Sequence, residues 1–348
     1  MKILVVCDIF GTVEENPFVR ELRNGLSLYG HDVVCNLNEF WNPDVPYDLV
    51  FFQWPDAFFS HDGLKWPLKE IYTQIALIKQ KKIPTVMTVH NLHPHDNNRL
   101  KQELYKNMFS MMDAFHHMGS FSYDMFKHEY PNAYHFIAPH PCYFDSSEVP
   151  LSVDECKKKY NLPNKIVVLA FGAFRNEEER KMFVNLRHDD ARNCLFWAPK
   201  INRTAHKRSL LSKAKSGLFY VLNGIKMEFG PISNEAVKEM VKASDIVFIQ
   251  RKEILNSGNV PLAFSFGKIV VGPDKGNVGR ILRETGNPVF NPDDRQSVLN
   301  GLKDALRLFD NNNLQGQRNL DYARKFLSKN YVSNLLNKEL LFVSKTSQ

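Results

Sequence analysis

The stretch DIVFIQRKEILNSGNVPLAFSFGKIVVGPDKG, residues 245–276, is the part of the sequence that most clearly indicates the fold. Two short apolar runs, DIVFIQ and KIVVGP, flank a polar loop at 251–258 and an apolar segment at 260–266 that Gly267 ends. Runs that are apolar almost throughout predict strands buried on both faces, and such strands occur in parallel sheets covered by helices. The stretch therefore predicts strand, helix and strand within one parallel sheet.

The same alternation of buried strand and helix fills the rest of the chain in two series. It predicts an α/β protein with two Rossmann-like, doubly wound parallel-sheet domains that face each other across a cleft. The expected strands lie in KILVVCD, HDVVCNL, DLVFFQW, PTVMTVHN, AFHHMG, AYHFIAPH, KIVVLAFGAF, NCLFWAP, LFYVLNG, DIVFIQ, KIVVGP and PVFNP. The expected helices span 16–29, 67–81, 177–187, 204–215, 233–243, 257–266, 294–308 and a tail from 315 to 343.

A segment rich in Ser, Pro and Lys, SSEVPLSVDECKKKYNLPNK at 146–165, separates the two series. It lacks a strong period and is typical of a linker followed by a short helix. We therefore expect an N-terminal Rossmann-like acceptor domain at 1–155 and a C-terminal Rossmann-like donor domain at 156–325. The last residues, 326–348, are expected to form a helix that packs back toward the N-terminal domain.

Composition narrows the class of protein. The chain has 348 residues, a formal net charge of +7 and five scattered cysteines without C-x-x-C spacing, which favours a reducing compartment and no zinc site. The first apolar run is too short for a signal peptide, and no run approaches the roughly 20 apolar residues that span a bilayer. We expect a cytoplasmic protein whose basic charge favours anionic partners, including the inner face of a membrane, and no nucleic-acid partner, since no recognition motif accompanies the charge.

Ligands of open parallel sheets bind outside the carboxyl ends of the strands, so the residues that follow the expected strands are the candidates for a functional site. Gly11 follows the first strand and is a candidate donor-binding residue, since glycine lets the backbone come close to a ligand or to the next helix. G-x-G-x-x-G is absent, which disfavours NAD or FAD dehydrogenases. After the fourth strand, VHNLHPHD holds His90 and Asp96 without the helical spacing of a metal site. His90 is expected to hydrogen-bond a sugar hydroxyl or to place an acceptor.

The second series carries features suited to a phosphate. Arg175 ends FGAFR directly after a buried strand, and a guanidinium forks onto phosphate oxygens. Asn256, Ser257 and Gly258 stand where a helix begins, so backbone amides and a hydroxyl are available to an anion.

Taken together, these residues resemble those of family 4-type glycosyltransferases over nearly the whole chain. The resemblance rests on GHDV at 30–33, VMTVHNLHP, IAPHPCYF, FGAFR, EFGPISNEAVKEMVKASDIVFI and SGNVPLAFSFGKIVVGPDKG. It implies the GT-B fold and transfer of a sugar from a nucleotide-diphosphate sugar, with UDP or GDP as the nucleotide, to a hydroxyl acceptor. A saccharide or lipid-linked saccharide acceptor, and a role in polysaccharide or glycolipid synthesis, follow from the same resemblance.

The resemblance also implies roles for single residues. Gly230 and Ile232 would line the nucleotide-base pocket through their backbone, and Asn256, Ser257 and Gly258 would bind the diphosphate. Arg175 and Arg251 would neutralise the leaving diphosphate, so neither a metal ion nor a cofactor beyond the donor is expected. Arg251 is expected to be a surface cation that contributes little to folding.

One departure from the family pattern leaves the stereochemistry open. Retaining members carry two glutamates eight positions apart, whereas here Glu253 is followed at that spacing by Pro261. An inverting reaction would need a base, for which His90, Asp96 and His140 are candidates. A nucleotide-sugar 2-epimerase of the same fold and a non-catalytic sugar-binding protein are the alternative functions.

Overall fold

The computed structural model of the protein describes residues 1–7, 16–60, 63–94, 98–189, 194–199, 222–228 and 232–346. The chain divides into two compact units: unit 1 comprises Met1–Tyr143 and Phe326–Gln348, and unit 2 comprises Phe144–Lys325. Gly11, Asp96 and Gly230 lie outside the described residues, as do the expected helix at 204–215 and most of the expected strand in LFYVLNG.

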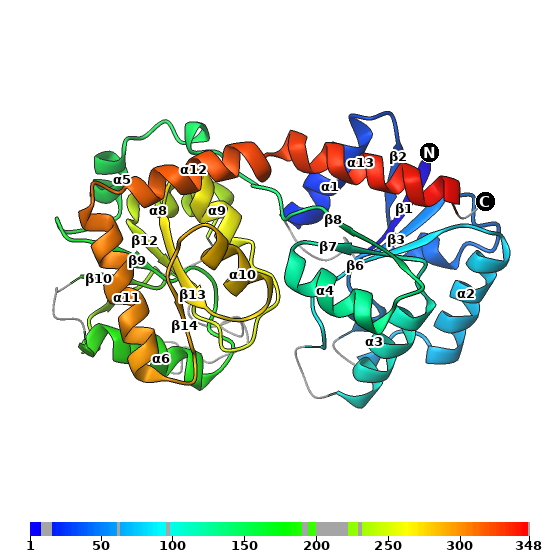
Figure 1. Ribbon diagram of the computed structural model, residues 1–348, viewed down its shortest axis with the longest axis horizontal. Coiled ribbons are helices and arrows are strands. Elements are labelled where there is room, and N and C mark those ends of the chain that lie inside the picture. The colour runs from blue at the N-terminus through cyan, green and yellow to red at the C-terminus, as the bar shows by residue number, and fades with distance from the viewer. Residues whose placement is uncertain are drawn as a thin grey trace. The chain divides into compact units, whose positions relative to one another are not determined.

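Unit 1 is built on a six-stranded parallel sheet of order β2-β1-β3-β6-β7-β8 (Figure 1). Every side chain of β3 and β6 is buried, as the uninterrupted apolar sequence LVFF of β3 predicts. The strands are β1 (Lys2–Val6), β2 (Asp32–Cys35), β3 (Leu49–Phe52), β6 (Thr85–Thr88), β7 (Ala114–His117) and β8 (Tyr134–Ile137). Its helices are α1 (Pro17–Ser27), α2 (Leu68–Gln80), α3 (Arg99–Met111), α4 (Ser120–Glu129) and α13 (Lys329–Thr346), and a hairpin pairs β4 (Phe59–Ser60) with β5 (Gly63–Leu64).

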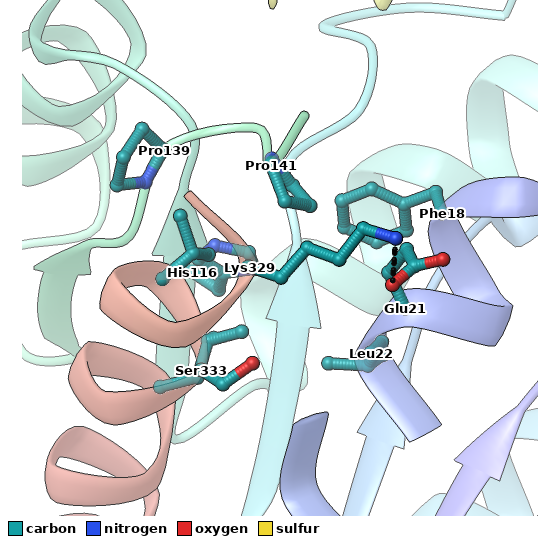
Figure 2. A pocket seen from close by; sticks show the side chains of 10 residues that line it. Phe18, Glu21, Leu22, His116, Pro139, Pro141, Lys329 and Ser333 are labelled. Carbon is teal, nitrogen blue, oxygen red and sulfur yellow. Dashed lines mark ion pairs between the residues drawn. The ribbon is translucent and has the colours of Figure 1, made fainter. Parts of the chain in front are cut away.

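The C-terminal helix α13 belongs to the core of unit 1, although it is last in the sequence. It lies against α1 so closely that a Cβ on Gly25 would stand 2.0 Å from Oγ of Ser333. Lys329 at its start pairs with the buried carboxylate of Glu21 at 3.4 Å, as Figure 2 shows. Its apolar face joins the core through four side chains, Val332, Leu336, Leu340 and Val343.

Unit 2 repeats the design with a six-stranded parallel sheet of order β11-β10-β9-β12-β13-β14. The strands are β9 (Val167–Leu169), β10 (Leu195–Trp197), β11 (Ile225–Lys226), β12 (Ile246–Phe248), β13 (Ile269–Pro273) and β14 (Val289–Phe290). The helices are α5 (Val153–Lys159), α6 (Glu177–Asp189), α8 (Asn234–Ala243), α9 (Asn259–Ser265), α10 (Gly276–Glu284), α11 (Arg295–Asp310) and α12 (Leu314–Phe326). The expected fold class of two doubly wound parallel-sheet domains is confirmed.

The boundary between the units falls earlier than the sequence suggested. Residues 144–155 were expected in the N-terminal domain but group with unit 2. The reason is a set of contacts with α8: Lys238 pairs with Glu148 at 3.3 Å, and Lys242 donates to the carbonyl oxygen of Val149 at 2.8 Å. The polar segment is therefore packed structure of unit 2.

Both sheets reverse their strand order at a definable point. In unit 1, β2 pairs with one edge of β1 and β3 with the other, so the reversal lies between β1 and β3. In unit 2 the reversal lies between β9 and β12. Ligands of doubly wound sheets bind at such switch points, beyond the carboxyl ends of the strands. The loops after β3, β9 and β12 are therefore where function is to be sought. No helix in the described parts of the chain is both long and apolar enough to cross a membrane.

Candidate functional site

In unit 2, three segments meet at the switch point. Gly172, in the loop after β9, has a φ of +101°, a left-handed conformation that favours glycine. Its carbonyl oxygen accepts a hydrogen bond from Nε2 of Gln250, which follows β12, at 3.0 Å. The carbonyl oxygen of Phe171 accepts from Nδ2 of Asn259, the first residue of α9, at 2.8 Å. Two side-chain amides therefore fix the loop after β9 to the loop after β12 and to α9.

An arginine–glutamate pair lies within this arrangement. Nη1 of Arg251 is 2.8 Å from Oε2 of Glu179, and their side chains are only 14% and 2% exposed. The same carboxylate oxygen accepts the backbone N–H of Arg175 at 2.8 Å. A Cβ on Gly172 would lie 3.6 Å from Nη2 of Arg251, so this guanidinium stands directly beside bare backbone. The expectation that Arg251 is a surface cation is wrong, because Glu179 holds it in a largely buried position.

Two further cations line the same edge of the sheet. Arg175 is exposed, and its Nη1 donates to the carbonyl oxygen of Glu253 at 3.2 Å. Lys252 pairs with Glu178 at 3.0 Å and with Asp293 at 2.8 Å. The structure thus brings the predicted residues Arg175 and Arg251 together around one buried carboxylate. Positive charge fixed at the end of a sheet is suited to bind a phosphate.

The predicted segment Asn256–Gly258 leads into α9 as expected, with Gly258 as the residue before the helix. Oγ of Ser257 accepts the backbone N–H of Asn259 at 3.3 Å, and Oδ1 of Asn256 accepts from Nδ2 of Asn277 at 2.8 Å. Helix α10 begins at Gly276 directly against this segment. There a Cβ would lie 2.5 Å from the carbonyl oxygen of Ile254, and φ is +57°. The loop is therefore held from behind by α10.

Ile232, the described member of the predicted base pocket, stands directly before Ser233, whose Oγ caps α8 by accepting the backbone N–H of Ala236 at 3.2 Å. Ile232 is half-buried. It lies between β11 and α8, and β11 is two strands away from β9 in the sheet. Its role in the nucleotide-base pocket stays a prediction.

In unit 1, His90 sits beyond the end of β6 in an aromatic setting. Its ring stacks on Trp54 with 4.0 Å between centroids and an interplanar angle of 18°, and Phe18 meets it edge-on at 4.9 Å. Nε2 of His90 donates to Oε1 of Gln53 at 3.1 Å. Desolvation by these neighbours holds the pKa of His90 well below its usual range, with smaller contributions from nearby histidines. His90 is therefore neutral at pH 7.

The two histidines that contribute to the pKa of His90, His116 and His140, are neutral as well. Nδ1 of His140 donates to the carbonyl oxygen of Pro141 at 3.0 Å, and its Nε2 accepts from the Tyr143 hydroxyl at 2.8 Å. His116 donates from Nε2 to the carbonyl oxygen of Ala138 at 2.8 Å and lines a small pocket between α1 and α13 (Figure 2). Burial lowers the pKa of His116 and of His140 to about 4. The three histidines of the candidate site of unit 1 are thus neutral and lie among aromatic rings.

The sequence did not single out three residues of these sites. Glu179 is one of three consecutive glutamates that open α6, and nothing in the sequence distinguishes the buried one. Gln53 and Trp54 follow the buried strand β3, and a polar residue directly after a fully apolar strand was a signal that could have identified Gln53. Among the residues that the structure describes, no group of three or more His, Cys, Asp or Glu side chains is placed to hold a metal ion.

Comparison with known proteins identifies the architecture. No protein-family model and no curated protein sequence matches the chain. Sucrose-phosphate synthase from Thermosynechococcus elongatus superposes with a TM-score of 0.75 at 11% identity, over 99% of each chain. HepE from Anabaena in complex with UDP-glucose gives 0.71 at 11% identity, over 98% of this chain and 100% of HepE. A glycosyltransferase from Rickettsia africae gives 0.71 at 13% identity, over 99% of this chain and 98% of its own. At such identities the likeness establishes the fold, which is the expected GT-B fold.

Proposed function

We propose that the chain is a glycosyltransferase that moves a sugar from a nucleotide-diphosphate sugar to the hydroxyl of a saccharide or lipid-linked saccharide. The observation that carries this proposal is the guanidinium of Arg251, held by buried Glu179 beside the bare backbone of Gly172 at the switch point of unit 2. A fixed cation next to backbone without a side chain suits a diphosphate, because the phosphate oxygens can approach closely.

A UDP-sugar is the donor that we propose. HepE, whose fold this chain shares, was solved with UDP, with UDP and glucose, and with UDP-glucose. Unit 2 would bind the nucleotide part of the donor. Unit 1, with its neutral histidines and aromatic rings, would bind the acceptor, since aromatic faces and neutral hydrogen-bonding groups suit sugar rings and hydroxyls.

The chemistry follows from these roles. The bond from the acceptor oxygen to the anomeric carbon of the sugar forms, the bond from that carbon to the diphosphate oxygen breaks, and UDP leaves. Arg251 and Arg175 would stabilise the negative charge that develops on the departing diphosphate. Since two guanidinium groups supply this positive charge, we propose that transfer is independent of a metal ion. Neutral His90 would accept the proton of the acceptor hydroxyl.

Release of UDP from UDP-sugars, measured with and without a panel of saccharide acceptors, tests the proposal. We expect acceptor-dependent UDP release that survives EDTA. Replacing Arg251 by Met should abolish most of it, whereas Arg307→Met, a change in an exposed ion pair on α11, should have a small effect. Conversion of the donor into an epimeric sugar would instead indicate a nucleotide-sugar 2-epimerase. Binding of the sugar without release of UDP would indicate a non-catalytic sugar-binding protein.

A further inference from the structure

Gln53 is a buried amide with an incomplete set of hydrogen bonds. It follows β3 directly and is 0% exposed. Its Oε1 is 3.1 Å from Nε2 of His90, while its Nε2 has no hydrogen-bond partner among the residues that the structure describes. Burying an amide N–H without a partner destabilises a fold. Stability therefore does not explain why a glutamine stands at this position.

A second glutamine in the same unit shows what a stabilising amide looks like. Gln74 in α2 is 9% exposed, and its Nε2 donates to the carbonyl oxygens of Phe40 at 2.7 Å and of Asn42 at 3.4 Å. Gln74 ties α2 to the segment after β2. Gln53 makes no comparable link, and its one hydrogen bond to a described side chain goes to His90.

That hydrogen bond has a chemical consequence for the imidazole. An amide oxygen only accepts hydrogen bonds, so Nε2 of His90 must carry the ring proton, and Nδ1 is then the nitrogen with the lone pair. Trp54 and Phe18 hold the plane of the ring. Among the described residues, the titratable groups that act on His90 are His116 and His140, and burial lowers the pKa of both to about 4.

We propose that Gln53 is a positioning residue that fixes the proton of His90 on Nε2, so that Nδ1 is the atom presented to a substrate hydroxyl. That this hydroxyl belongs to the sugar acceptor rests on the proposed glycosyltransferase function. The tautomer itself does not, and the two parts can be tested separately.

The tautomer is tested by NMR of the full-length protein labelled with ¹⁵N-histidine at about pH 7, because ring nitrogen shifts distinguish a protonated from an unprotonated nitrogen. Loss of signals in His90→Gln assigns the ring. We expect Nε2–H in the wild type and a mixture of tautomers in Gln53→Met, whose melting temperature should equal or exceed that of the wild type. The matched control Gln74→Met should lower the melting temperature and leave the His90 signals unchanged. An Nδ1–H ring in the wild type, or signals that Gln53→Met leaves unaltered, overturns the proposal.

The consequence for transfer is tested by kinetics. We expect Gln53→Met to lower kcat about tenfold or more with the KM for the UDP-sugar unchanged. Gln53→Glu places a carboxylate beside the imidazole, which favours its charged form, and should move the acidic limb of the pH profile to higher pH. If the wild type turns over UDP-sugars and neither variant alters kcat or the pH profile, the positioning role is wrong. If the wild type turns over no UDP-sugar, the proposed function fails, and the NMR result alone decides the role of Gln53.

Discussion

The two units share one architecture but carry opposite chemistry at their switch points. Ten of the 12 histidines of the chain fall within unit 1, where His90, His116 and His140 are held neutral among aromatic rings. At the switch point of unit 2 an arginine and a glutamate are buried together. The same sheet topology therefore supports neutral histidines in one unit and a charged pair in the other.

The two sites suit different ligands. A diphosphate carries negative charge that fixed cations stabilise, and the energy of burying such a cation is recovered through a partner such as Glu179. A sugar hydroxyl is neutral, and it is bound best by neutral groups that donate and accept hydrogen bonds. Substitutions that remove the charged pair or the neutral histidine should therefore have different effects.

The largest effect is expected from Arg251→Met. Loss of a positioned charge at the leaving group should lower kcat for UDP release by about 10³-fold. It also leaves the carboxylate of Glu179, 2% exposed, without its cation, which should lower the free energy of unfolding by about 3 kcal/mol. Urea unfolding and steady-state kinetics measure the two losses. In the double variant Arg251→Met with Glu179→Met, stability should return while activity does not; recovery of activity there would remove Arg251 from the donor site.

Next in size is the effect of His90→Gln. Losing the acceptor-side imidazole should lower transfer by about 10²-fold, while the affinity for UDP stays that of the wild type, because His90 belongs to unit 1 and the proposed nucleotide site to unit 2. Titration calorimetry with UDP and acceptor-dependent kinetics separate the two quantities. An equal loss of UDP affinity would contradict the division of labour between the units.

Acid should weaken unit 1 before unit 2. Burial lowers the pKa of His116 to about 4, against an ordinary value of 6.5, so the unfolded chain binds more protons between these values. The stability that neutral His116 contributes is fully present above pH 6.5 and falls as the pH drops toward 4, by about 3 kcal/mol for His116 alone.

In unit 2 the described histidine, His188, is exposed. Hydrogen exchange at about pH 7 and about pH 5, normalised to the unfolded chain, should show protection lost from β7 and β8 but kept in β9 and β13. Uniform loss would contradict the contrast.

The smallest effect is expected from a glycine substitution at the start of α10, beside the unit 2 site. Gly276→Ala would bring a Cβ within 2.5 Å of the carbonyl oxygen of Ile254 at a φ of +57° and should cost about 2–3 kcal/mol. The matched change Gly30→Ala, at a φ of +78° with nothing within 4 Å, should cost only the conformational strain of about 1 kcal/mol. Both values come from urea unfolding. Equal losses would mean that α10 does not support the loop before α9.

Much of the fold could be predicted from the sequence because buried parallel strands leave a clear trace. Runs such as LVFF and IVVG are apolar throughout, and strands β3 and β13 lie where these runs stand. Helix α10 was missed, since PDKG at 273–276 is typical of a turn and the helix begins at its final glycine. The domain boundary was missed because its residues are polar, and their contacts with α8 are tertiary.

The candidate site could be predicted only in part. Arg175 and Arg251 were identified because a cation after a buried strand is visible in the sequence. Their shared partner Glu179 was not, because ion pairing across 72 positions depends on how the loops after β9 and β12 meet. Gln53 was missed for the same reason: its significance comes from His90, 37 positions away.

Thermal unfolding of the purified protein with UDP, GDP, ADP, dTDP and NAD tests whether unit 2 binds a nucleoside diphosphate, because a ligand that binds only the native state raises the melting temperature. We expect UDP to raise it in the wild type and not in Arg251→Met. A rise with NAD alone, or with none of these nucleotides, would contradict the assignment of unit 2 as the site of a nucleotide-diphosphate donor.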